Sequence, residues 1–177
     1  MAPVYNDKEI RIVHVTSHLG GGVGKAISAL VTSRSTLKTK HQIICLEQPI
    51  NTIFYEKILK NNVQIHITRD PKKISEIFDS SDILQIEWWS HPLMCDFIFN
   101  NAITFHGRLA VWFHQSGLFS PMLPSTLFEH SNALMLTSEC SLAADNILRL
   151  DKDIKEKISV ISSACELEYL PKTRSHH

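Results

Sequence analysis

The chain has 177 residues, 44% of them hydrophobic and 20% charged, so it can bury the core of one globular domain. Eighteen Lys and Arg residues balance eighteen Asp and Glu residues, so no net positive field attracts nucleic acid, which we exclude as a partner. The four cysteines are far apart and form no CxxC pair, which indicates reduced thiols in a cytoplasmic protein. The sequence predicts neither a signal peptide nor a membrane-spanning helix.

The first predicted element is a strand at Ile10–Thr16, which is apolar at nearly every position, as in a parallel sheet that is covered on both faces. A polar, glycine-rich turn follows at residues 17–22. Apolar residues then recur at helical spacing from Val23 to Val31, which predicts the first helix.

The alternation of strand and helix continues to the end of the chain. Further strands are predicted at residues 42–46, 63–67, 83–87, 108–114, 133–137 and 158–161, and further helices at 53–60, 71–78, 92–100, 126–130 and 140–150. We therefore predict an α/β fold over residues 1–163: a single Rossmann-like, doubly wound, mostly parallel sheet of about seven strands with helices on both faces. Ligands of such sheets bind beyond the carboxyl ends of the strands.

Three consecutive glycines follow the first strand. Gly21 and Gly22 stand where a backbone can approach a ligand closely and where the amides of a helix N-terminus point at an anion, so a phosphate is the partner that they suit. A tight turn that only packs the first helix on the sheet is the other interpretation. Both remain open from the sequence.

The run GGVGK, which ends at Lys25, is similar to the variant phosphate loop of ParA/MinD-like partition ATPases. A P-loop ATPase is therefore an alternative function. Gly20 stands where that variant has its extra lysine, and Ala26 stands where a P-loop needs a hydroxyl on magnesium.

Polar side chains also end the fourth and fifth strands. Glu87 is a carboxylate that needs a polar partner, and Trp88 is a ring that either stacks on a sugar or packs in the core. His114, followed by Ser116, is the first polar side chain after a very apolar strand, so it faces any ligand bound there. Four further histidines are predicted to have structural places: His14 and His66 as packed or edge residues within strands, and His41 and His106 as surface loop residues.

Four segments together resemble the N-terminal, acceptor-side half of a GT-B glycosyltransferase of family 4, the group 1 type. The first is similar to the family's opening strand and glycine loop, the second to its DIVHVH-type strand, and the last to its VIPNGVD crossover segment. They are residues 12–30 (IVHVTSHLGGGVGKAISAL), 82–92 (DILQIEWWSHP), 111–117 (VWFHQSG) and 160–170 (VISSACELEYL). The last segment departs from the family, because Ser163 and Ala164 stand where it has Asn-Gly.

The resemblance implies one half of a retaining enzyme that transfers a sugar from a nucleotide-sugar, such as a UDP- or GDP-sugar, to a glycan or glycolipid. The paired glutamates of the family (E-x7-E) belong to the C-terminal donor-binding half, so the chain is expected to be incomplete without that domain. Residues 164–177 are expected to be the crossover segment, closed at His176 and His177 by a purification-tag remnant.

The resemblance also assigns roles. Gly21 and Gly22 would approach the donor diphosphate and the acceptor, and His114 would lie beside the transferred sugar and polarise or orient a hydroxyl. The acceptor pocket would be lined by Glu87, Trp88 and Ser116. No metal or cofactor is implied. The enzyme would be cytoplasmic, with possible peripheral contact to the membrane, and a non-catalytic carbohydrate-binding or partner subunit of a split glycosyltransferase is a further alternative.

Overall fold

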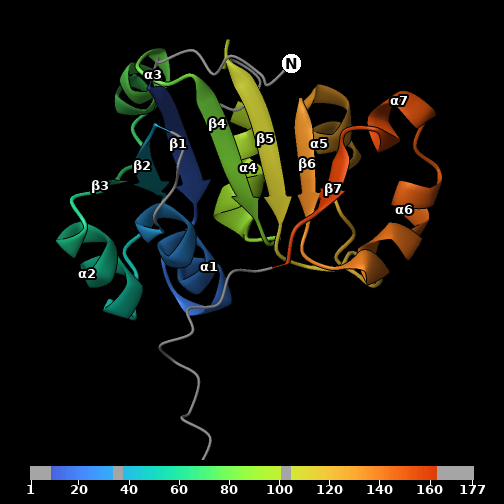
Figure 1. The fold of residues 1–177 in the computed structure, drawn as a ribbon, viewed down its shortest axis with the longest axis horizontal. Helices are drawn as coiled ribbons and strands as arrows, with labels where there is room; N and C mark the ends of the chain where they lie inside the picture. Colours follow the sequence, from blue (N-terminus) through green and yellow to red (C-terminus); the bar gives the residue numbers. More distant parts are fainter. Residues whose placement is uncertain (1–8, 34–37, 101–104, 163–177) are drawn as a thin grey trace, which may run out of the picture.

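The computed structural model describes residues 9–33, 38–100 and 105–162. They form one seven-stranded sheet in which every neighbouring pair of strands is parallel, in the order β3-β2-β1-β4-β5-β6-β7 (Figure 1). The predicted fold is confirmed. The strands are β1 (Ile10–Thr16), β2 (Thr39–Cys45), β3 (Gln64–Ile67), β4 (Ile83–Trp88), β5 (Arg108–Phe113), β6 (Ala133–Leu136) and β7 (Ile158–Val160). The predicted crossover segment, residues 164–177, lies outside the described residues.

Helices cover both faces of the sheet. They are α1 (Gly21–Thr32), α2 (Ile53–Lys60), α3 (Pro71–Asp79), α4 (Pro92–Asn100), α5 (Ser125–His130), the 3-10 helix η2 (Glu139–Ala143), α6 (Asp145–Leu148) and α7 (Lys152–Lys155). In Figure 1, α1 and α2 lie in front of the sheet, and α4 and α5 lie behind it. No described helix is long and apolar enough to cross a bilayer.

The two faces of the sheet have separate apolar cores. The larger core packs residues of α3, α4 and α5 against one face, where Val15, Ile86 and Phe113 are fully buried. The smaller core joins Ile27 of α1 and Ile58 of α2 to Ile43 on the other face. Since side chains alternate along a strand, neighbouring residues of β1, β4 and β5 enter different environments.

The direction of the strand order changes beside β1, which pairs with β2 on one side and with β4 on the other. At such a point, consecutive crossovers run to opposite sides of the sheet, and a crevice opens at the carboxyl ends of the two strands. The loops after Thr16 and Trp88 border this crevice, and the loop after Phe113 lies beside it, because β5 pairs with β4. The fold therefore brings the polar strand ends together.

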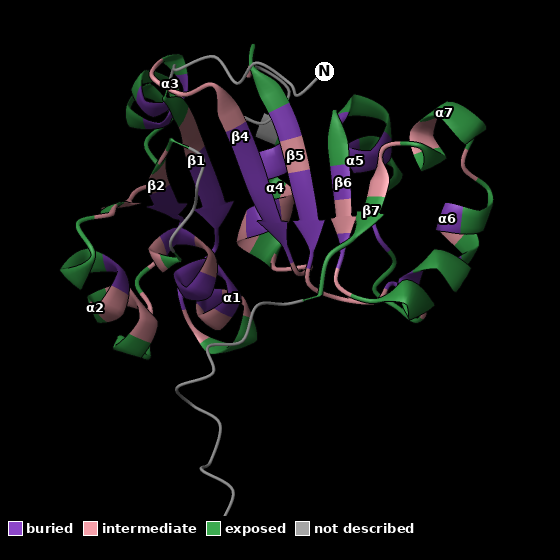
Figure 2. Cartoon of the chain, viewed as in Figure 1, coloured by how far each residue is buried: buried purple, intermediate pink, exposed green. Residues whose placement is uncertain are grey.

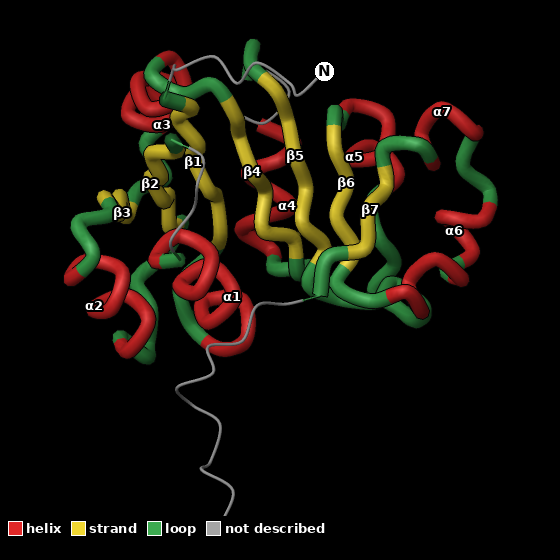
Figure 3. Tube along the Cα trace, viewed as in Figure 1, coloured by secondary structure: helices red, strands yellow, loops and turns green. Residues whose placement is uncertain are grey.

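One predicted helix, at residues 140–150, is wrong. The structure has η2 and α6 instead, separated by Ala144 with an extended backbone (ψ 134°). Figure 3 shows in red that the helical segments around α6 and α7 are short. Ala144 packs in the core, and Asn146 donates a hydrogen bond from Nδ2 to the Leu123 carbonyl at 2.8 Å, which fixes the second piece. The four-residue α7 was not predicted, because it is too short to show a helical repeat.

Two boundaries also differ from the prediction. β2 begins at Thr39 and not at residue 42. His41 therefore lies inside a strand, and its predicted place in a surface loop is wrong. α1 begins at Gly21, whose φ of 61° is a conformation that glycine adopts without strain. The rest of the glycine run is therefore the first turn of the helix.

Gly22 and Gly24 make a matched pair for testing how α1 packs. A Cβ at Gly24 would overlap the Leu19 carbonyl, whereas a Cβ at Gly22 would meet nothing within 4 Å. We expect Gly24→Ala to lower the free energy of unfolding by about 1–3 kcal/mol or more, because backbone must move. Gly22→Ala should leave it unchanged or raise it slightly, since alanine favours a helix. Urea unfolding of both variants measures this, and equal stabilities would contradict the close packing.

Candidate functional site

A buried carboxylate lies at the end of β4. Glu87 has no exposed surface, and its two oxygens take part in three hydrogen bonds, with side chains of β1, of β4 itself and of the residue that follows β5. Oε1 lies 2.8 Å from His14 Nδ1 and accepts from Gln85 Nε2 at 2.8 Å, and Oε2 lies 2.7 Å from His114 Nε2. A charge in a sheet is stable only when it is paired and hydrogen-bonded in this way.

The same line of contacts continues across β1 to β2. His14, which is also fully buried, places Nε2 2.9 Å from His41 Nδ1, and the two rings stack with centroids 5.2 Å apart. His41 Nε2 lies 3.1 Å from Thr39 Oγ1. We call His41, His14, Glu87 and His114 the polar line. It crosses β2, β1, β4 and β5 on the face of the sheet that carries α1.

The electrostatics of the polar line follow from its burial. Burial alone would raise the pKa of Glu87, but the hydrogen bonds from His114 and His14 outweigh it and lower the pKa from 4.5 to about 2. Burial is the main cause that lowers the pKa of His41 from 6.5 to about 4, and the neighbouring His14 adds to it. Glu87 is therefore an anion at neutral pH, and His41 is a neutral imidazole.

A second group of side chains lies where the loops after β1, β2 and β4 meet. We call His18, Glu47, Trp89 and His91 the mouth cluster. His91 Nε2 lies 3.4 Å and His18 Nε2 lies 3.9 Å from Glu47 Oε1. The Trp89 ring meets His18 edge to face, with centroids 5.1 Å apart, and lies 4.9 Å from His91. All four are partly exposed, so they can contact a ligand in the crevice.

The ligand atoms of His18, Glu47 and His91 lie within 4.8 Å of one another, close enough for a metal ion. Their hydrogen bonds argue against that use. Nδ1 of His18 accepts a hydrogen bond from the Gly20 N–H at 2.9 Å. In the same way, Nδ1 of His91 accepts one from the Leu93 N–H at 3.3 Å. A neutral imidazole has a single lone pair, so both rings present an N–H at Nε2, which suits the Glu47 carboxylate and not a cation.

Five of the six predicted site residues lie in three places: the polar line, the start of α1 and the loop after β5. Glu87 and His114 lie together, as their positions at neighbouring strand ends indicate. Gly21 and Gly22 lie at the start of α1, and the positions of their missing side chains are open. Ser116 lies two residues beyond His114, where its Oγ accepts the Leu118 N–H at 3.4 Å. None of these placements tests contact with a ligand, which stays a prediction.

Trp88 is not brought to this group. Its side chain is 3% exposed and packs in the larger core, on the opposite face from Glu87, because consecutive strand residues alternate. It borders an apolar cavity of about 420 Å³ there, together with Phe99 and Met122. The tryptophan at the crevice is Trp89.

The sequence reasoning missed several residues of the site. His14 was assigned to packing and His41 to a loop, while Gln85 and Glu47 were not considered. One signal was available: Gln85 and Glu87 are two residues apart in a strand and must share a face. The pairing of β1 with β2, which aligns Ile12 with His41 and so sets His41 beside His14, has no such signal.

The glycine run does not form a phosphate-wrapping loop. Four residues, 17–20, connect β1 to α1, and Lys25 is already the fifth residue of the helix. A P-loop needs its glycines outside the helix, so that several N–H groups surround a phosphate. The geometry therefore weighs against the ATPase alternative.

No protein-family model and no curated protein matches this sequence. Among solved structures, the chain is similar to a glycosyltransferase of Rickettsia africae, with a TM-score of 0.56 and 17% identity over 89% of this chain and 43% of that chain. It is also similar to HepE of Anabaena, solved with UDP and glucose, with a TM-score of 0.62 and 10% identity over 90% of this chain and 46% of that chain. An O-GlcNAc transferase of Thermobaculum terrenum gives a TM-score of 0.57 and 12% identity over 88% of this chain and 28% of that chain.

At these identities the likeness shows the fold. The chain matches one half of a GT-B glycosyltransferase fold and spans less than half the length of each of these proteins. Figure 2 shows that the strands leading to the site, the lower parts of β4 and β5, are buried. His114, the last residue of the polar line, therefore lies at the carboxyl edge of the sheet, where the crevice opens.

The low pKa of Glu87 predicts how stability depends on pH. A carboxyl whose pKa is lower in the folded state stabilises the fold fully above its ordinary pKa of 4.5, and this contribution is lost as pH falls toward about 2. Glu87→Gln should therefore lower the free energy of unfolding most at neutral pH, and its difference from the wild type should shrink below about pH 4.5. Urea unfolding from about pH 7 to about pH 3 measures this. A difference that stays constant would mean that Glu87 is not the ionised partner.

Proposed function

We propose that this chain is the acceptor-side half of a retaining glycosyltransferase of the family 4 type, which transfers a sugar from a nucleotide-sugar to a glycan or glycolipid. The observation that carries the proposal is the His114–Glu87 pair at the crevice of a sheet that matches one half of a GT-B fold. A histidine held by a buried carboxylate is a common catalytic arrangement, because the carboxylate orients the ring.

His114 would contact the transferred sugar or the attacking hydroxyl. Its side chain is 5% exposed, and Nε2 is occupied by Glu87. Within the described part of the chain, Nδ1 has no hydrogen-bond partner, so it is the atom available to a ligand. In this role His114 orients or polarises a hydroxyl and does not form a covalent bond.

The mouth cluster would bind the acceptor. The indole of Trp89 offers a ring face for a sugar, and Glu47 offers a carboxylate that accepts hydrogen bonds from sugar hydroxyls. The negative charge of Glu47 disfavours a phosphate beside it. The donor diphosphate would therefore lie toward the amides at the start of α1, beside Gly21 and Gly22.

Most contacts to the nucleotide-sugar would come from a C-terminal donor-binding domain, either in the same protein or, in the alternative of a split enzyme, in a partner subunit. The family chemistry needs no metal or cofactor, because helix dipoles and basic side chains stabilise the leaving phosphate. The proposal includes a cytoplasmic location, with peripheral membrane contact when the acceptor is a glycolipid.

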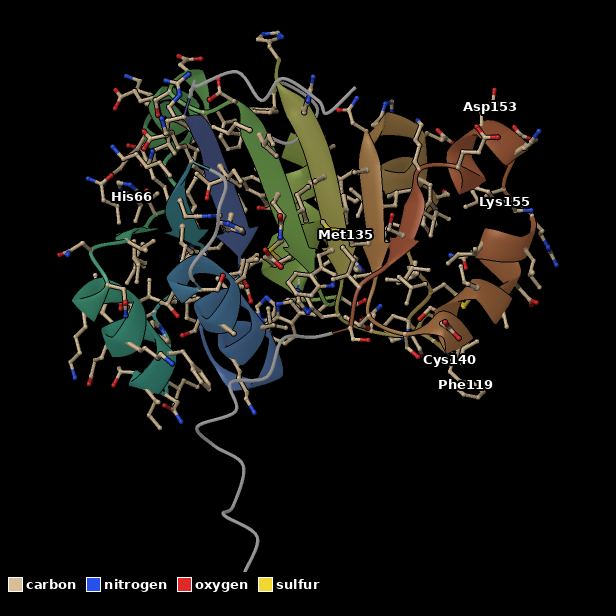
Figure 4. All side chains as sticks on the ribbon, in the orientation of Figure 1. His66, Phe119, Met135, Cys140, Asp153 and Lys155 are labelled. Atoms are coloured by element: carbon tan, nitrogen blue, oxygen red, sulfur yellow. The ribbon has the colours of Figure 1, made fainter. Side chains whose placement is uncertain are left out.

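The role of His114 predicts a large loss of turnover. In an enzyme that contains both halves, His114→Ala should lower kcat by about 100-fold or more, as expected for a positioned imidazole. The matched control is His66→Ala, since His66 lies on the edge strand β3, far from the crevice (Figure 4). Transfer from UDP- and GDP-sugars to glycan and lipid acceptors is the assay. An unchanged rate for His114→Ala would remove this residue from the site.

The ATPase alternative makes a separate prediction. If residues 20–25 bound a nucleoside triphosphate, Mg-ATP at millimolar concentration should raise the Tm of the chain. We expect no change, because those residues form the first turn of α1. A clear rise that Lys25→Ala abolishes would instead favour the ATPase.

A further inference from the structure

We propose that Glu87 is a positioning residue that keeps the proton of His114 on Nε2 and leaves the Nδ1 lone pair facing the ligand. The arrangement of protons follows from the contacts and the burial of the polar line and Gln85, without reference to any ligand. Its catalytic meaning rests on the proposed function. One consequence concerns the ligand: the group that meets His114 is a hydrogen-bond donor, such as a sugar hydroxyl, and not a phosphate oxygen.

The first step is that an ionised carboxylate can only accept hydrogen bonds. Glu87 is an anion at neutral pH, since its pKa is about 2. His114 Nε2, which lies 2.7 Å from Oε2, must therefore carry a hydrogen, and so must His14 Nδ1, which lies 2.8 Å from Oε1. With the N–H of Gln85 as a third donor, the carboxylate is satisfied.

The remaining atoms of the polar line allow two arrangements, and His114 is the same in both. His41 is neutral and has one N–H. In one arrangement His41 Nδ1 donates to His14 Nε2, and His41 Nε2 accepts a hydrogen bond from the Thr39 hydroxyl. In the other His14 is an imidazolium that donates to His41, which donates to Thr39. Neither arrangement moves the proton of His114 from Nε2.

Packing also holds the His114 ring. It lies against Trp112, with ring centroids 4.7 Å apart and the planes tilted by 41°, and the backbone N–H of His114 donates to the Trp88 carbonyl at 2.8 Å. Because the ring is held on one side and bonded to Glu87 on the other, Nδ1 keeps its direction. A lone pair there can accept a hydrogen bond from a hydroxyl, and Glu87 stabilises positive charge that develops on the ring.

The 15N-labelled chain without ligand tests the proton arrangement directly. Long-range 15N–1H correlation spectra at about pH 7.5 report which nitrogen of each histidine carries hydrogen. We expect His114 with hydrogen on Nε2 and a lone pair on Nδ1. Hydrogen on Nδ1 of His114, in a neutral ring or in an imidazolium, would overturn the proposal, whatever the activity of the protein.

The Glu87→Gln variant makes a sharper test, because the structure predicts how the amide will orient. Oε1 faces two donors, His14 and Gln85, so the carbonyl oxygen of the new glutamine should take that place. Its NH2 group then faces His114 Nε2, which must become an acceptor. We expect the hydrogen of His114 to move to Nδ1 while His14 is unchanged, and His66→Gln to leave both as in the wild type.

Activity separates this proposal from the proposed function. In an enzyme with both halves, Glu87→Gln should lower kcat by about 100-fold or more and alter its pH profile, although the His114 ring is still present. If the wild type is active and Glu87→Gln has the same kcat, the positioning role is overturned. If the wild type transfers no sugar but the tautomers are as expected, the proposed function fails and the proton arrangement stands.

Discussion

The arrangement of the site depends on one buried negative charge. Glu87 has no exposed surface, and an unpaired carboxylate in that position would be strongly destabilising. Its hydrogen-bond donors come from β1, β4 and the end of β5, and parallel pairing brings them to the same face. The three strands that meet at the crevice are thus joined by side chains as well as by their backbones. A change in the register of β1 or β5 would take one of the three donors away from the charge.

Much of the fold could be predicted from the sequence, for physical reasons. Strands buried on both faces are apolar at nearly every position, as Ile10–Thr16 and residues 109–113 are, and the helices between them require parallel crossovers. His114 and Glu87 could be found because both are polar residues at the ends of apolar strands. The broken helix at residues 140–150 could not be found, because Ala144 leaves the helical conformation for tertiary reasons, namely its burial and the contact of Asn146 with Leu123.

The partners of Glu87 were less accessible to sequence reasoning. A histidine within an apolar strand, such as His14, has the same local pattern whether it is merely packed or bonded to a carboxylate 73 residues away. His41 was placed in a loop because β2 was expected to start later. The choice between Trp88 and Trp89 depended on the residue at which the strand ends, and strand boundaries are less certain than strand positions. Pairing across the sheet is a long-range property that local periodicity does not contain.

The contact between Gly24 and the Leu19 carbonyl has a consequence for movement. The first turn of α1 rests directly on the loop that borders the crevice, with no side chain between them to change rotamer. That loop cannot shift toward a ligand unless α1 moves with it, and α1 is anchored by Ile27 in the smaller core. This wall of the crevice is therefore stiff, and the loop cannot close around a bound molecule by a local adjustment of its own.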